Sequence, residues 1–200
     1  MNLKIMDKTM KNILIVNGHE YYEIAHGKYN STLVDTAKTL LEKEHFDVKT
    51  TIIQNGYDNE EEINKFLWAD IIIFQFPKYW MSIPAAFKEY LDNTLSNSYG
   101  KLYAHDGRKD GRKYGHGGLI TDKKYMFSIT MNAPKEAFDD INEFFEGKSV
   151  DELFLWLHKA FQFLGFKPLK TFICHDVMTK PNIQEDKDRF IKHLQTTLNI

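Results

Sequence analysis

Short apolar runs recur along the chain, and segments with more polar residues separate them. The clearest runs are residues 12–18, 71–76 and 124–130, and two shorter or more polar runs occupy 47–53 and 170–176. A run without a polar face is typical of a strand that is buried on both faces, as in a parallel sheet. The pattern therefore predicts five strands.

Between these runs, apolar residues recur at helical spacing. Leu33, Ala37 and Leu41, for example, fall on one face of a helix, and either Asn30 or Ser31 is a suitable N-cap for it. The residues predicted to be helical are 31–44, 60–70, 84–95, 150–166 and 184–198.

Strands and helices alternate along the chain, which predicts an α/β fold with right-handed crossovers. We expect a flavodoxin-like three-layer sandwich, in which a five-stranded parallel sheet in the order 2-1-3-4-5 carries helices on both faces. Ligands bind such sheets at the carboxyl ends of the strands, near the point where the strand order reverses. The segments after strands one, three and four (residues 18–32, 77–83 and 131–138) should therefore line one site.

The composition is that of an ordinary globular domain. The chain has 200 residues, of which 42% are hydrophobic and 27% charged, and its formal net charge of -2 gives no reason to expect a nucleic-acid partner. We expect residues 1–9 to be a flexible extension and residues 10–200 to form a single domain. Cys174 is the only cysteine, which is typical of a reducing, cytoplasmic compartment. No apolar stretch approaches the roughly 18 residues of a membrane span, so we expect no stable membrane insertion.

The first of the three segments contains "HGKYNSTL", residues 26–33. Neither a GxGxxG fingerprint nor a Walker-type phosphate loop is present. Hydroxyl groups and free backbone N–H groups at a helix N-terminus nevertheless suit a phosphate or pyrophosphate, and His26 and Lys28 could add positive charge. The alternative is an ordinary helix start without a ligand.

The second and third segments contain groups that suit a flat heterocycle. Tyr79, Trp80 and Met81 follow a buried strand and could flank a conjugated ring. The alternative is an apolar contact with the next helix or with a partner chain. In the third segment, "TMNAPKEAF", Thr130 and Asn132 could hydrogen-bond the polar edge of a heterocycle. The alternative there is a plain turn between a strand and a helix.

Together these segments resemble a known family. The stretches "NGHEYYEIAHGKYNSTL", "FLWADIIIFQFPKYWMSIPAAFKEYLD" and "KKYMFSITMNAPKEAF" are similar to the modulator of drug activity B family, and the resemblance extends from about Lys11 to about Leu198. Members are NAD(P)H:quinone oxidoreductases with a flavodoxin-like fold. They bind FAD non-covalently and work as homodimers with the active site at the dimer interface. Lys78 and Tyr79 depart from the Gly-Trp that the family pattern leads us to expect.

The resemblance implies FAD-binding residues, carried over by position. Those around the phosphates and the ribityl chain would be Ala25, His26, Gly27, Lys28, Tyr29, Asn30, Ser31 and Thr32; those against the isoalloxazine, Lys78, Tyr79, Trp80 and Met81; those at its polar edge, Thr130, Met131, Asn132 and Ala133; and, near the adenine half, Tyr114. Candidates for the wall of the substrate pocket are Pro134, Phe138, Phe144 and Phe145, for which ordinary packing is the alternative.

The expected activity is therefore FAD-dependent reduction of quinones by NADPH, by ping-pong hydride transfer, with a role in protection against oxidative stress. The flavin carries this chemistry, so no side chain is named as catalytic. The 28 aromatic residues (15 Phe, 10 Tyr and 3 Trp) favour a homodimer. The eight histidines form no HExxH motif, so we expect no metal site. The alternatives are an FMN electron carrier and a flavin-binding redox-sensing or interaction protein.

A glycine-rich loop at residues 98–122 is unusually basic. Its positive side chains could contact the 2′-phosphate of NADPH, the FAD phosphates, or only water. These residues are Lys101, Arg108, Lys109, Arg112 and Lys113.

Overall fold

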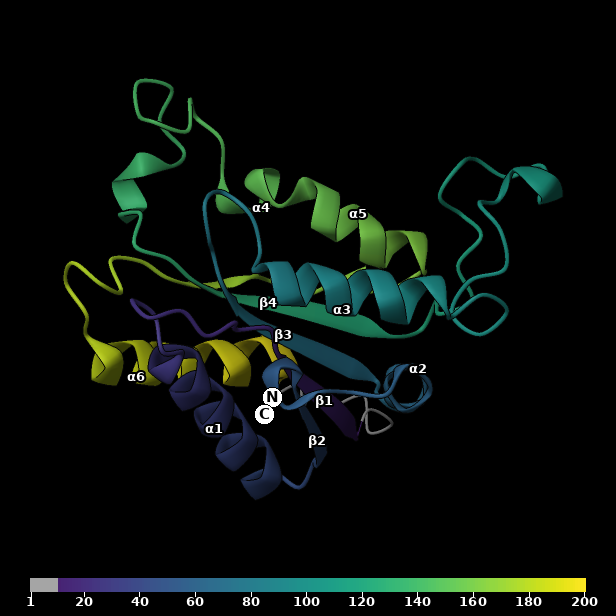
Figure 1. The fold of residues 1–200 in the computed structure, drawn as a ribbon, viewed down its shortest axis with the longest axis horizontal. Coiled ribbons are helices and arrows are strands. Elements are labelled where there is room, and N and C mark those ends of the chain that lie inside the picture. The colour runs from purple at the N-terminus through teal and green to yellow at the C-terminus, as the bar shows by residue number, and fades with distance from the viewer. Residues whose placement is uncertain (1–10) are drawn as a thin grey trace, which may run out of the picture.

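A parallel sheet forms the centre of the protein, which we describe from a computed structural model covering residues 11–200 (Figure 1). The expected extension at residues 1–9 lies outside the described residues. The strands are β1 (Asn12–Asn17), β2 (Asp47–Ile52), β3 (Ile71–Pro77), β4 (Lys124–Thr130), β5 (Lys167–Pro168) and β6 (Phe172–Cys174). Their order is β2-β1-β3-β4-β5, and β6 also pairs with β4. The fold class and the strand order 2-1-3-4-5 are thus confirmed.

The last strand differs from the prediction, because two short strands replace one. Both pair with β4 in parallel, β5 at its amino end and β6 at its carboxyl end. Between them the N–H of Leu169 still donates to the carbonyl of Tyr125 on β4, but polar groups of the next two residues bond elsewhere. The carbonyl of Lys170 lies 2.9 Å from Nε2 of His193, and the hydroxyl of Thr171 donates to Asp151 at 2.6 Å. These contacts interrupt the ladder, so the sheet has six strands rather than five.

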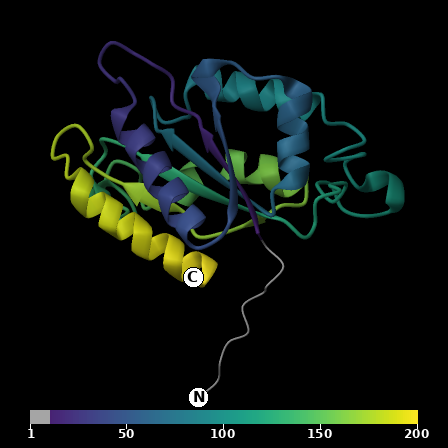
Figure 2. The same ribbon diagram turned by 90° about the horizontal axis from the view of Figure 1, so that it is seen from below.

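Helices cover both faces of the sheet. They are α1 (Lys28–Lys43), α2 (Asn59–Trp68), α3 (Ala85–Ser96), α4 (Val150–Leu153), α5 (Leu155–Phe163) and α6 (Ile183–Leu198). α1 and α6 lie side by side on one face, and α2, α3 and α5 cover the other (Figures 1 and 2). The helix predicted at 150–166 is broken at Phe154, whose dihedral angles of -99° and 19° leave the helical range.

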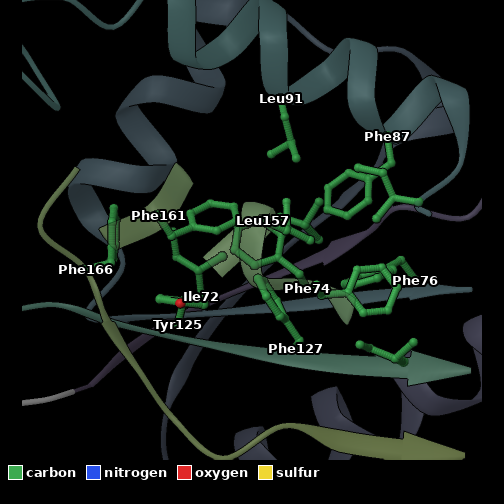
Figure 3. Close-up of a cluster of buried hydrophobic side chains, with 14 of the residues drawn as sticks. Ile72, Phe74, Phe76, Phe87, Leu91, Tyr125, Phe127, Leu157, Phe161 and Phe166 are labelled. Atoms are coloured by element: carbon green, nitrogen blue, oxygen red, sulfur yellow. The ribbon is translucent and has the colours of Figure 1, made fainter. Parts of the chain in front are cut away.

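The two faces of the sheet pack different side chains. Alternate residues of β3 point to opposite faces, as the pleat requires. Ile71 and Ile73 join the core under α1 and α6, while Phe74 and Phe76 join the core under α3 and α5. Figure 3 shows this second, strongly aromatic core, in which Phe87 of α3 points toward the rings of the strands. Both cores consist of buried, closely packed side chains, which hold the carboxyl ends of the strands in fixed positions.

Candidate functional site

One buried side chain joins the three segments at the carboxyl end of the sheet. The side-chain oxygen of Asn30, in the first turn of α1, accepts a hydrogen bond at 2.8 Å from the amide of Gln75 on β3. It also accepts one at 3.3 Å from the hydroxyl of Thr130, the last residue of β4. All three residues are buried. The segments after β1, β3 and β4 therefore converge, as the sequence predicted.

The N-terminus of α1 is open. Gly27 is its N-cap with a left-handed φ of 78°, and no side chain in the described part of the chain caps the helix. The prediction of Asn30 or Ser31 as N-cap was wrong, because the helix begins three residues earlier. By contrast, Asp58 and Asn182 cap α2 and α6 through their side chains. The first-turn N–H groups of α1 therefore have no side-chain acceptor, and the helix dipole favours an anion there.

His19, which the sequence analysis missed, shapes this helix start. Its ring is 5% exposed, and a Cβ on Gly27 would lie 2.4 Å from it, so only glycine can follow this path. Nε2 of His19 lies 3.1 Å from the carbonyl oxygen of Ala25. Burial lowers the pKa of the imidazole. No motif in the sequence marks His19, because its role depends on packing across a loop.

The second segment exposes one large aromatic ring to solvent. Trp80 is 95% exposed, and it and Met81 both adopt left-handed backbone conformations, with φ of 42° and 63°. Tyr79 instead packs inward: its ring meets that of Tyr22 edge-on at 4.9 Å, and its hydroxyl donates to the carbonyl of Glu20 at 3.3 Å. Burial raises the pKa of Tyr79 to about 12. Two successive non-glycine residues with positive φ are strained, and such strain is typical of ligand sites.

Lys78 links the second segment to the third. Its backbone N–H donates to the carbonyl of Thr130 at 2.8 Å. Its ammonium lies 3.4 Å from the sulfur of Met81 and 5.5 Å from the centre of the Phe145 ring. Burial lowers the pKa of Lys78. Within residues 11–200 this cation makes no ion pair.

In the third segment, Asn132 holds the next loop in place. Its side-chain oxygen accepts hydrogen bonds from the backbone N–H groups of Met178 and Thr179, at 3.0 and 2.8 Å. Its amide nitrogen has no recorded partner among the described residues, so it remains available as a donor. Met131 is buried in the aromatic core and lends the segment rigidity rather than a free side chain.

The candidates for the substrate-pocket wall lie close to this segment. Phe138 and Phe145 stack with their ring centres 4.2 Å apart. Phe144 packs edge-on against Phe145 at 5.0 Å and is 72% exposed, and Pro134 is exposed directly after Ala133. Through the contact of Phe145 with Lys78, these rings adjoin the second segment.

Tyr114 lies apart from the other predicted site residues. Its loop is bound to the opposite end of the sheet: the N–H of Ile120 donates to the carbonyl of Leu164, just before β5. Figure 1 shows this loop at the far end from the segments after β1, β3 and β4. The Tyr114 ring packs against Phe163 at 5.8 Å and is 70% exposed. In its own chain, Tyr114 therefore does not join the site.

The remaining residues of the first segment also lie at the site, but some of their side chains are exposed and others bond to neighbouring groups. Two of them are committed to other contacts: the Tyr29 hydroxyl donates to Asp186 of α6 at 2.6 Å, and the Thr32 hydroxyl donates to the carbonyl of Lys28. Ser31 and Lys28 are exposed, as is His26, whose ring stacks on that of Tyr21 at 5.1 Å.

Comparison with known proteins shows to which family the chain belongs. A family model described as "flavodoxin-like fold" matches residues 11–198. The chain belongs to this family. It is also 44% identical over 187 residues to the NADPH:quinone oxidoreductase MdaB of Haemophilus influenzae, a match that covers 92% of this chain and 97% of the relative. The resemblance to the modulator of drug activity B family is thereby confirmed.

Solved structures share the fold at low sequence identity. An NAD(P)H:quinone oxidoreductase from Methanothermobacter marburgensis aligns with a TM-score of 0.69 at 16% identity, covering 92% of this chain and 97% of that one. General stress protein 14 of Treponema denticola, solved in complex with FMN, aligns with a TM-score of 0.68 at 18% identity, covering 94% and 98%. At these identities the likeness establishes the flavodoxin-like architecture.

Two further properties concern residues 11–200 only. Within that range no helix has the length and apolar character needed to cross a membrane. Nor does that part of the chain bring three histidine, cysteine or acidic side chains together in a way that could hold a metal ion.

Proposed function

We propose that this protein is an FAD-dependent NAD(P)H:quinone oxidoreductase. The observation that carries the proposal is that Asn30, at an uncapped helix start, bonds Gln75 and Thr130, which lie on the two strands that lead into the strained aromatic loop and the donor-bearing turn. The flavodoxin-like family membership and the 44% identity to a quinone oxidoreductase support the same activity.

The start of α1 is the part of the site that suits the flavin phosphates. The first-turn N–H groups find no side-chain acceptor within residues 11–200, and α1 has 16 residues, long enough for a full helix dipole. Gly27 lets the backbone approach closely because its αL conformation and its contact with His19 leave no room for a side chain. Lys28 adds positive charge beside it, and the exposed imidazole of His26 lies next to it in the chain.

The second and third segments suit the isoalloxazine. The exposed ring of Trp80 and the side chain of Met81 offer apolar surface, and Asn132 offers an amide donor for the polar edge. The Lys78 ammonium adds a cation near that edge, where negative charge develops on reduction. A bound FAD would supply the hydride chemistry between NADPH and a quinone, for which we propose a ping-pong order. The protein chain itself would bind the flavin, orient it and shield it from water.

We infer that the active form is a homodimer. Large apolar side chains are exposed around the carboxyl end of the sheet, among them Ile24, Trp80, Ile141 and Phe144. An exposed apolar patch of this kind is typical of an interface. A second copy docked there would shield the flavin, and Tyr114 could reach a flavin only from such a second copy. We further propose a cytoplasmic location and a role in protection against oxidative stress.

The test begins with the absorbance spectrum of the purified protein and the identity of the flavin released by heat. FAD that NADPH bleaches and menadione restores would support the proposal. Absence of flavin, with no uptake from added FAD, would overturn it. The size of the particle in solution, measured by light scattering, tests the dimer separately.

FMN is the second candidate cofactor, because a structural neighbour with a TM-score of 0.68 was solved with FMN. Release of FMN rather than FAD would keep the phosphate role of the α1 start. It would leave Tyr114 without the adenine that the proposed FAD site assigns to it.

A further inference from the structure

A hollow lies along the edge of the sheet, between β6 and α6. This groove has a volume of about 490 Å³. Its lining includes six basic or titratable side chains: Lys135, Lys170, His175, Arg189, Lys192 and His193. Among residues 11–200, no aspartate or glutamate lines it. We call it the edge groove.

The cations of the edge groove are largely unneutralised. Arg189 pairs with Asp186, but within residues 11–200 Lys135, Lys170 and Lys192 form no ion pair. This positive charge affects the pKa values of the two histidines in the groove. Burial, assisted by Arg189, lowers the pKa of both His175 and His193. A concave surface with excess positive charge concentrates anions.

The edge groove is continuous with the candidate site. Nδ1 of His175 lies 3.0 Å from the carbonyl oxygen of Ala133, in the third segment. Lys135, which opens the short helix η3 (Lys135–Ala137), belongs to that segment and also lines the groove. From His175 the groove follows β6 back to Lys170. At roughly 3.3 Å per residue this path covers about 16 Å, a length suited to an extended dinucleotide.

Protection of an exposed strand edge does not account for this charge. Lysines that block edge-to-edge pairing project from the edge strand or its flanks, as Lys170 does. Lys192 and Arg189 instead come from α6, and Lys135 comes from η3. Three separate elements thus direct cations toward one hollow, which is the arrangement of a ligand site.

We propose that the edge groove holds the phosphorylated adenosine end of NADPH, with Lys170 and Lys192 contacting the 2′-phosphate. The nicotinamide end would then lie at the third segment, beside Ala133. This inference rests on the proposed function, and it selects NADPH over NADH as the hydride donor. It also selects the edge groove over the basic loop at residues 98–122.

The experiment measures binding of 2′,5′-ADP and of 5′-AMP by calorimetry, using the full-length flavin-loaded protein. Neither nucleotide donates hydride, so binding is read separately from activity. The test variant is Lys170→Gln/Lys192→Gln. The matched control is Lys109→Gln/Lys113→Gln, which removes the same charge from the basic loop. All four lysines are exposed, so both variants should fold, which circular dichroism checks.

We expect the wild-type protein to bind 2′,5′-ADP more tightly than 5′-AMP. The edge-groove variant should raise the Kd for 2′,5′-ADP about tenfold or more, and the KM for NADPH with it, while the KM for NADH stays within about twofold. The loop variant should match the wild type. Affinity that depends on the loop lysines, or equal binding of the two nucleotides, would overturn the inference.

Turnover of NADPH with menadione in the same preparations separates the two proposals. Turnover without preference for 2′,5′-ADP would overturn the edge-groove assignment and leave the proposed function standing. Absence of both flavin and turnover would overturn the proposed function, and with it the assignment of the groove to NADPH.

Discussion

The two ends of the sheet both carry long loops rich in aromatic and glycine residues, yet they are built differently. At the carboxyl end, buried polar groups from separate strands meet on Asn30, and the ring of Trp80 is left exposed. At the amino end, the loop at residues 98–122 is held by close backbone contacts. A Cβ on Gly117 would lie 1.6 Å from the carbonyl oxygen of His105, and one on Gly118 would lie 2.1 Å from the backbone of Leu164.

The difference shows what a glycine or an aromatic residue means in each place. In the amino-end loop, Gly117 and Gly118 allow backbone segments to touch, which is a packing role. At the carboxyl end, Gly27 opens a helix start, and Trp80 is left almost fully exposed by the rest of residues 11–200. Residue types alone do not distinguish the two ends of the sheet. What distinguishes the carboxyl end is its set of buried hydrogen bonds between polar side chains from separate elements.

The largest effect should come from Asn30→Leu. This change leaves the donors of Gln75 and Thr130 buried without their acceptor, so the free energy of unfolding should fall by about 2–4 kcal/mol. The flavin should be lost as well. Urea denaturation measures the stability, and Asn64→Leu, at an exposed position of α2, should change it by less than about 0.5 kcal/mol. Equal losses in the two variants would refute the bridging role.

Gly118→Ala tests the other end of the comparison. The new methyl group must displace the backbone of Leu164, so we expect a loss of about 1–3 kcal/mol in the free energy of unfolding. Gly111→Ala is the matched control, since its φ is +71° but nothing lies within 4 Å. That control should lower the free energy of unfolding by only about 1 kcal/mol, which is the cost of a left-handed backbone conformation for a residue with a Cβ. If both substitutions cost the same, close packing is not what requires Gly118.

The buried histidines should make stability depend on pH. His19 has a pKa below its usual 6.5 because burial disfavours the charged ring. The unfolded chain therefore binds the proton first, and stability falls as pH drops from about 7 toward 5, by up to about 1.4 kcal/mol per pH unit for one proton. His19→Gln should flatten this slope in urea titrations at several pH values. An unchanged slope would place the effect on His175 and His193.

The smallest effect on stability should come from Trp80→Ala. Because the side chain is 95% exposed, the free energy of unfolding should change by less than about 0.5 kcal/mol. The variant should retain less flavin and should no longer elute at the volume of a dimer, since the ring is proposed to contact both the flavin and the second copy. Tyr79→Ala, which removes the packing against Tyr22, should cost clearly more stability. A large loss of stability in the Trp80 variant would show that the ring serves the fold instead.

The sequence by itself determined the α/β class, the strand order and the three segments of the site. Local patterns carry this information, because a strand buried on both faces must be apolar throughout, as at residues 71–76. The apolar residues of the loop after β3 also stood out, since loops are usually polar. The resemblance to the modulator of drug activity B family added the expectation of a flavin cofactor and of a homodimer.

Only the tertiary structure decided how the site is held together. The bridge from Asn30 to Gln75 and Thr130 spans 45 and 100 residues of chain, so no local pattern could reveal it. His19 and Gly27 are likewise coupled through space, which moved the start of α1 to Lys28. The placement of Tyr114 at the other end of the sheet, and the gathering of cations in the edge groove, depend on which elements pack together. Long-range packing, rather than local preference, fixed these features.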